Sequence, residues 1–132
     1  MLTLRKTTAD DAAFWKRLGK AMPQGGETYM IEDGAQHIGV LHYTLLWEEL
    51  PFLNLLLIRE DKRGVGYGKG ALALWEENLR AAGYCTALLS TRKSESGQQF
   101  FRKLGYADCG ALDMRGFARP QPDEELFLYK NL

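Results

Sequence analysis

Residues 63–70 read Arg-Gly-Val-Gly-Tyr-Gly-Lys-Gly, so every second residue from 64 onward is glycine. An almost continuously apolar run, residues 52–58, comes before this segment and is typical of a buried strand. Large apolar residues recur at helical spacing after it, up to Gly83. Glycines let the backbone approach a ligand closely, and a helix start offers unpaired amides and a positive dipole end. With the charges of Arg63 and Lys69, the segment is predicted to bind a phosphate or pyrophosphate.

Three phosphate-binding motifs compete for this segment. A P-loop needs a glycine five residues before its Gly-Lys pair and Ser or Thr after it, whereas Arg63 and Gly70 stand at those places. A dinucleotide fingerprint can be placed on residues 66–71, but residues 90–92, Ser-Thr-Arg, offer no acidic group after the next strand. The third motif, Arg-x-x-Gly-x-Gly, is met in full by residues 63–68.

The rest of the chain alternates between strand and helix patterns. Seven segments are predicted as strands: residues 2–5, 28–32, 36–47, 52–58, 85–89, 106–112 and 125–129. Helices are predicted after the first, fourth and fifth of these strands. The strand–helix–strand unit at residues 52–89 predicts one parallel pair inside a largely antiparallel sheet, which is an α+β fold. In the third strand, alternation predicts that Ile38, Val40 and His42 share a face.

Composition limits the class of protein. The chain has 132 residues, which predicts a single domain over residues 1–132. Its 17 basic and 17 acidic residues give zero net charge, which argues against a protein that coats nucleic acid or binds membranes through a basic surface. Cys85 and Cys109 are too few for a disulfide scaffold, and no residue pattern resembles a metal cluster. Without an apolar signal segment or a spanning run, a cytoplasmic location is expected.

A second motif follows the glycine segment after one further strand. Residues 100–106 read Phe-Phe-Arg-Lys-Leu-Gly-Tyr, an aromatic-rich helix end followed by Lys-x-Gly-aromatic. With both motifs in this order and spacing, the chain resembles the GNAT superfamily of N-acetyltransferases over nearly its whole length. The resemblance implies an α+β, three-layer fold with a mixed, mostly antiparallel sheet and helices on both faces. It also implies a V-shaped splay between two parallel strands, residues 52–58 and 85–89.

The resemblance implies acetyl-CoA as cosubstrate and no metal. The pantetheine arm of acetyl-CoA is expected to pair with the free backbone edge at residues 57–59, and its pyrophosphate is expected on the amides of residues 64–69. The backbone amide of Leu57 is expected to hold the oxyanion. The residues expected to bind the cofactor are Leu57, Ile58, Arg59, Arg63, Gly64, Val65, Gly66, Tyr67, Gly68, Lys69, Ser94 and Phe101.

Two positions depart from the family pattern. The family often has a tyrosine that protonates the departing thiolate where this chain has Phe101, which has no proton to give. Ser94 stands at a helix-start position that asparagine often holds. Tyr67, Ser94 and Tyr106 are the candidates to supply the proton instead. Because a thiol has a pKa of about 8.5, a thiolate is a tolerable leaving group even without an acid.

Many members of the family have a glutamate general base in the central strand, but the fourth predicted strand of this chain contains no glutamate. Its only polar residue is Asn54, and the nearest acids are Glu48 and Glu49 in the loop that enters it. We choose Glu48, whose aromatic neighbours could form an apolar wall around an acceptor, and His42 is a second candidate by its ordinary pKa. The predicted catalytic residues are Glu48, Asn54 and Leu57.

The resemblance implies an N-acetyltransferase that moves an acetyl group to a primary amine of a small molecule or peptide, by direct attack in a ternary complex. A catalytically weak or inactive acyl-CoA-binding regulatory module is the alternative, and a nicotinamide-dinucleotide-binding domain is a third reading. Only residues 19–26 separate the first helix from the second strand, so the acceptor site is expected to be less covered than is usual. We expect a monomer or homodimer without nucleic-acid or membrane partners.

Overall fold

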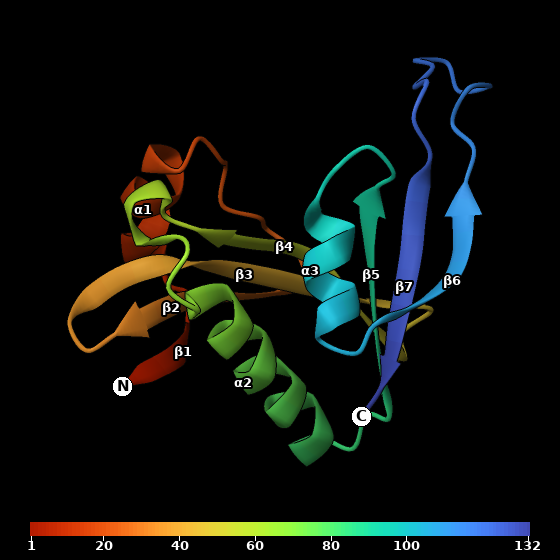
Figure 1. Ribbon diagram of the computed structural model, residues 1–132. Helices are drawn as coiled ribbons and strands as arrows, with labels where there is room; N and C mark the ends of the chain where they lie inside the picture. The colour runs from red at the N-terminus through yellow and green to blue at the C-terminus, as the bar shows by residue number, and fades with distance from the viewer.

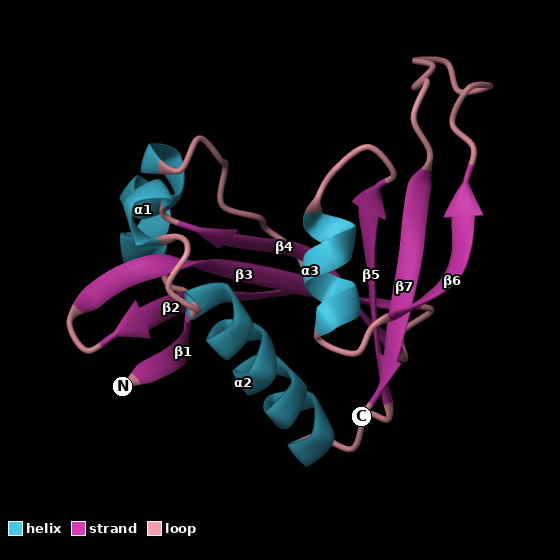
Figure 2. Ribbon diagram, viewed as in Figure 1, coloured by secondary structure: helices cyan, strands magenta, loops and turns pink.

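The computed structural model describes residues 1–132 and contains one seven-stranded sheet in the order β1-β2-β3-β4-β5-β7-β6 (Figures 1 and 2). The strands are β1 (Leu2–Lys6), β2 (Glu27–Asp33), β3 (Gln36–Leu46), β4 (Leu50–Ile58), β5 (Thr86–Arg92), β6 (Ala107–Leu112) and β7 (Glu125–Asn131). Every neighbouring pair is antiparallel except β4 with β5. The predicted mixed, mostly antiparallel sheet with one parallel pair is therefore confirmed.

Helices cover both faces of this sheet (Figure 2). The helical segments are the 3₁₀ turn η1 (Ala9–Asp11), α1 (Ala12–Arg17), the 3₁₀ turn η2 (Glu60–Lys62), α2 (Tyr67–Ala81) and α3 (Gly97–Lys103). Met30 packs with Phe14 and Trp15 of α1, whereas the next residue, Ile31, packs in the same core as Trp75 of α2. Because successive strand residues point to opposite faces, the sheet is the middle of three layers, as predicted. None of the helices is long and apolar enough to cross a membrane.

The parallel strands β4 and β5 separate after a short contact. They pair at only two positions, and the second of these is Leu53 with Leu89. The next residue of β4, Asn54, is an extra residue in the ladder with β3, because Leu53 and Leu55 pair with consecutive residues of that strand. Such a bulge bends the strand, and Figure 1 shows β4 turning away from β5. The predicted V-shaped splay is present.

A second bulge, in β3, makes one sequence prediction wrong. Two consecutive residues of β2 pair with Gly39 and His37, which leaves Ile38 as the extra residue. Ile38 therefore belongs to the α2 core, whereas Val40 belongs to the α1 core. The predicted common face for Ile38, Val40 and His42 fails because strict alternation breaks at a bulge.

A buried ion pair ties α2 to β7. Glu76, which is 5% exposed, accepts a hydrogen bond of 2.8 Å from the Tyr106 hydroxyl and pairs with Lys130 Nζ at 2.9 Å. Burial and the neighbouring carboxylate raise the pKa of Tyr106. Replacing Glu76 with glutamine leaves the Lys130 ammonium without its charge partner. We expect the free energy of unfolding to fall by about 1–3 kcal/mol, measured by urea denaturation. Glu77→Gln, on the exposed neighbour, is the control, and an equal loss in both variants would contradict the expectation.

Candidate functional site

The glycine loop connects β4 to α2 through the turn η2. Gly64 and Gly66 have φ angles of +82° and +95°, the left-handed conformation that favours glycine. Gly66 is the N-cap of α2, and its carbonyl accepts a hydrogen bond of 3.0 Å from the amide of Gly70. The amides of the first helical turn have no partner within the helix and lie at the positive end of its dipole. This geometry suits an anionic group.

A cavity of about 560 Å³ lies over the glycine loop; we call it the phosphate pocket. Its walls come from the end of β4, residues 62–69 and α3. Of the residues predicted to bind the cofactor, it brings together Leu57, Ile58, Arg63, Gly64, Gly66, Tyr67, Gly68, Lys69 and Phe101. Leu56, Lys62, Gly97 and Phe100 complete the lining and were not predicted. Lys62 adds a third cation beside Arg63 and Lys69, and only the turn η2 brings it there.

Three predicted cofactor residues do not line the phosphate pocket. The Arg59 guanidinium donates two hydrogen bonds, of 3.0 and 2.7 Å, to Asp61. Val65 is 72% exposed on the outside of the loop. Ser94 donates to the Asp123 carboxylate through its amide, at 3.1 Å, and through its hydroxyl. Each of these departures depends on a contact or an exposure that the motif itself does not encode.

A second cavity, of about 570 Å³, occupies the opening between β4 and β5; we call it the splay pocket. Asn54, the bulge residue, lines it and donates a hydrogen bond of 2.8 Å from Nδ2 to the Thr44 hydroxyl. Leu56, Gly97 and Phe101 line both the splay pocket and the phosphate pocket. The two pockets therefore adjoin along a common wall, with Phe101 in that wall.

The splay pocket contains charged side chains that the sequence did not single out. Arg92 Nε pairs with the Glu125 carboxylate at 2.7 Å, and Glu95 lines the same pocket. Arg92 and Glu125 are far apart in sequence but face each other across the β5–β7 ladder. No local motif reveals this pair, because it requires knowing that β7 lies beside β5.

Two predicted base candidates line neither of these pockets. Glu48 lies in the tight loop between β3 and β4 with a φ of +64°. From Leu50 to Ile58, β4 has nine residues, and at about 3.3 Å per residue this separates its two ends by roughly 26 Å. The His42 ring makes a 2.9 Å hydrogen bond with the carbonyl of Gly25 in the loop after α1. Glu48 is therefore remote from the phosphate pocket, and the His42 ring holds a loop in place.

None of the three hydroxyls predicted as substitute acids is free. Tyr67 donates a hydrogen bond of 2.6 Å to Asp33, and this bond raises the pKa of Tyr67 and lowers that of Asp33. Ser94 and Tyr106 donate to the carboxylates described above. A hydroxyl held by a carboxylate is a poor proton donor to a third group. Each of the three hydroxyls therefore already donates its proton to a carboxylate.

Gly39 of β3 determines how closely β3 approaches the end of β4. A Cβ atom at Gly39 would overlap the carbonyl oxygen of Leu57 and lie 3.0 Å from Cα of Ile58. We expect Gly39→Ala to push the two strands apart and to lower the free energy of unfolding by about 1–3 kcal/mol, measured by urea denaturation. At Gly25, where a Cβ would meet nothing within 4 Å, alanine is the control. Unchanged stability of Gly39→Ala would show that β4 is not held this way.

Comparison with known proteins gives a family and a set of structural neighbours. The family model described as "Acetyltransferase (GNAT) family" matches residues 3–106. No curated protein matches the chain. A GNAT family acetyltransferase from Elizabethkingia anophelis with acetyl-CoA bound has a TM-score of 0.77 and 16% identity, over 99% of this chain and 98% of that one.

Two further neighbours have more specific names. A spermidine/spermine N-acetyltransferase from Vibrio cholerae, in complex with manganese ions, has a TM-score of 0.79 and 12% identity, over 98% of this chain and 92% of that one. The ribosomal-protein-S18-alanine N-acetyltransferase from Escherichia coli has a TM-score of 0.76 and 13% identity, over 99% and 94%. At such identities the likeness establishes a common fold.

Proposed function

Since the chain belongs to the GNAT acetyltransferase family, we propose that it transfers the acetyl group of acetyl-CoA to a primary amine of a small molecule or peptide. The observation that carries this proposal is the common wall of the two pockets. The phosphate pocket adjoins the splay pocket between β4 and β5, so one extended molecule can occupy both.

The residues present fit acetyl-CoA. The amides of the first turn of α2, with Lys62, Arg63 and Lys69, suit its pyrophosphate. Beyond Leu53, β4 has no ladder partner on the side of β5. Its free N–H and C=O groups can pair with the amides of the pantetheine arm, as in strand addition.

Acetyl-CoA, when bound, supplies the thioester whose acyl carbon is attacked by the amine. The chain's part in the reaction is to hold the reactants in line and to stabilise charge. We propose that the backbone amide of Leu57 donates to the thioester carbonyl oxygen and that Asn54 lies beside the reacting atoms. Glu95 and Glu125 are the carboxylates of the splay pocket, and they can receive the amine proton, directly or through water.

The structural neighbours support a primary amine as acceptor. The neighbour from Vibrio cholerae is named as a spermidine/spermine N-acetyltransferase. The neighbour from Escherichia coli is named as a ribosomal-protein-S18-alanine N-acetyltransferase. We propose that this protein acts in the cytoplasm as a monomer or homodimer, without nucleic-acid or membrane partners.

Ligand titration followed by turnover tests the proposed function. We expect acetyl-CoA to bind in the micromolar range and NADPH not to bind. Thiol release from acetyl-CoA should then appear with at least some members of a panel of primary amines. Binding of NADPH alone would refute the proposal.

The alternative, an inactive acyl-CoA-binding module, is favoured by one observation: Phe101 has no proton to give, and the three hydroxyls predicted to replace it donate to carboxylates. Acetyl-CoA binding without turnover of any amine would select this alternative.

A further inference from the structure

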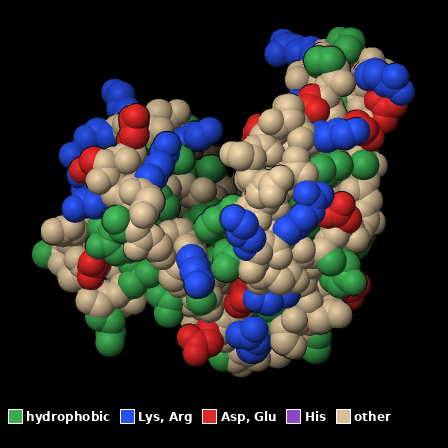
Figure 3. Space-filling model, viewed as in Figure 1, with side chains coloured by type: hydrophobic (Ala, Val, Ile, Leu, Met, Phe, Trp, Pro, Cys, Tyr) green, Lys and Arg blue, Asp and Glu red, His purple; other side chains and the backbone are tan.

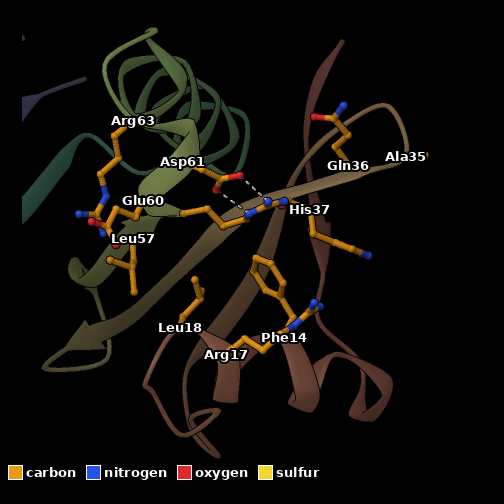
Figure 4. A pocket seen from close by; sticks show the side chains of 11 residues that line it. Phe14, Arg17, Leu18, Ala35, Gln36, His37, Leu57, Glu60, Asp61 and Arg63 are labelled. Carbon is orange, nitrogen blue, oxygen red and sulfur yellow. Dashed lines mark hydrogen bonds and ion pairs between the residues drawn. The ribbon is translucent and has the colours of Figure 1, made fainter.

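A third cavity, of about 600 Å³, lies between α1 and η2; we call it the α1 pocket (Figure 4). Phe14 and Arg17 of α1, with Leu18 directly after it, form one wall, and the segment from Leu57 to Arg63 forms the opposite one. Leu57 and Arg63 also line the phosphate pocket. The α1 pocket therefore adjoins the part of β4 where we propose that acetyl transfer takes place.

Most of the charged groups in the α1 pocket already have a partner. Arg59 and Asp61 neutralise each other through their two hydrogen bonds, drawn as dashed lines in Figure 4. Arg63 donates a hydrogen bond of 2.9 Å to the carbonyl of Ile58 and also lines the phosphate pocket. Glu60 stands on the η2 wall with Arg63 and is the one carboxylate of the pocket without an ion-pair partner. This leaves the Arg17 guanidinium as the cation of the α1 wall.

Arg17 has no carboxylate partner, but its guanidinium is held in place by an aromatic ring. It forms no ion pair, and its guanidinium carbon lies 5.6 Å from the centre of the Phe14 ring. This cation–π contact holds a planar, permanently charged donor group at the pocket wall. The carbon atoms of Phe14, Leu18 and Leu57 line the pocket beside it. A guanidinium group next to apolar side chains suits a ligand that has an acidic group attached to a carbon skeleton.

The surroundings of the pocket favour an anion as well. Lys16, Lys20 and Lys62 stand on or next to α1 and η2 and form no ion pair, whereas Asp11 and Asp61 of the same region are each paired with an arginine. Figure 3 shows Lys and Arg side chains gathered over the lobe that holds α1 and η2. An acidic molecule approaching this lobe is attracted before it reaches Arg17.

We infer that the acceptor is an amine that also carries an acidic group, a carboxylate or a phosphate, and that Arg17 binds this group in the α1 pocket. The inference rests on the proposed function. It places the acidic end of the acceptor in the α1 pocket, while the amine at the other end reaches the thioester beside Leu57. It names a substrate class distinct from polyamines, which carry no acidic group.

Matched acceptors test this assignment. Lysine is compared with cadaverine, its decarboxylated form, tyrosine with tyramine, and phosphoethanolamine with ethanolamine. We expect kcat/KM to be at least about tenfold higher for the acid-bearing member of one or more pairs. The first two pairs report on a carboxylate and the third on a phosphate.

Arg17→Gln should remove this preference. We expect the KM for the acid-bearing acceptor to rise about tenfold, while kcat and the KM for acetyl-CoA stay close to wild type. Lys16→Gln is the matched control, because Lys16 is an exposed cation on the same helix but does not line the α1 pocket. Preference for the decarboxylated amines, or an equal effect of both substitutions, would overturn the inference.

Failure of this inference can be told apart from failure of the proposed function. If acetyl-CoA binds but no amine is acetylated, the proposed reaction is wrong. Titration of lysine, tyrosine and phosphoethanolamine into the CoA complexes of wild type and Arg17→Gln then still decides the site. Affinity at least about tenfold weaker in Arg17→Gln supports it, and equal or undetectable binding in both overturns it.

Discussion

Replacing Gly66 with valine is expected to lower the affinity for acetyl-CoA at least about a hundredfold. Gly66 has a φ of +95°, a conformation that a β-branched residue adopts only at a cost of about 1–2 kcal/mol or more. Relief of this strain would turn the loop and with it the first-turn amides of α2. Gly66 lines the phosphate pocket and a Cβ there meets no protein atom within 4 Å, so an added side chain would lie at the edge of the space we assign to pyrophosphate. Both effects act on the same group of the ligand.

The matched control separates strain from ligand contact. Gly34, in the turn between β2 and β3, also has a positive φ, +61°, and no atoms within 4 Å of a Cβ. Gly34→Val should therefore lose stability in the same way but keep its affinity for acetyl-CoA. Isothermal titration, with urea denaturation of both variants, makes the measurement. Wild-type affinity in folded Gly66→Val would mean that the pyrophosphate is bound elsewhere.

The glycine-loop side of the candidate site is predictable from sequence because its parts are consecutive. Residues 63–70 carry the glycines, two of the three cations and the helix start together, so one motif specifies both backbone shape and most of the charge. The hydrophobic run before Arg59 and the helical spacing after Lys69 place the motif between a strand and a helix. Most residues predicted on this basis do line one pocket.

The rest of the site depends on partners that are distant in sequence. Glu125 reaches the splay pocket because β7 lies between β5 and β6, which no local pattern specifies. Ser94 stands at a helix-start position that asparagine often holds in the family, but Asp123, from the segment before β7, accepts its hydrogen bond. Glu48 is close to β4 in sequence, yet the extended strand carries the glycine loop roughly 26 Å away from it.

Bulges are the other reason that sequence periodicity fails. Alternation assumes that every residue of a strand pairs with one residue of its neighbour. Ile38 and Asn54 are extra residues in their ladders, and each shifts the side chains beyond it to the other face. The bulge at Asn54 is also what makes the splay possible, so the position where the periodicity fails is the position that opens the pocket.

The Phe101→Tyr substitution tests whether the chain lacks a general acid, and we expect it to raise kcat by about tenfold or more. Phe101 lies in the wall common to the phosphate and splay pockets, packed edge-on against Tyr106 with ring centres 5.8 Å apart. A hydroxyl on its ring adds a proton donor in a wall from which the thiolate of CoA would leave. The hydroxyls of Tyr67, Ser94 and Tyr106 already donate to carboxylates, so none of these three supplies the same proton as readily.

The pH profile of kcat makes this expectation specific. A tyrosine acid must be protonated to act, so the gain should be present near neutral pH and disappear as the pH rises through its ordinary pKa of about 10. Phe117→Tyr, on the exposed ring in the loop between β6 and β7, controls for an added hydroxyl elsewhere. If Phe101→Tyr leaves kcat unchanged at all pH values, protonation of the thiolate does not limit the rate. Catalysis by the wild-type chain would then need no general acid for the leaving group, which the low pKa of a thiol permits.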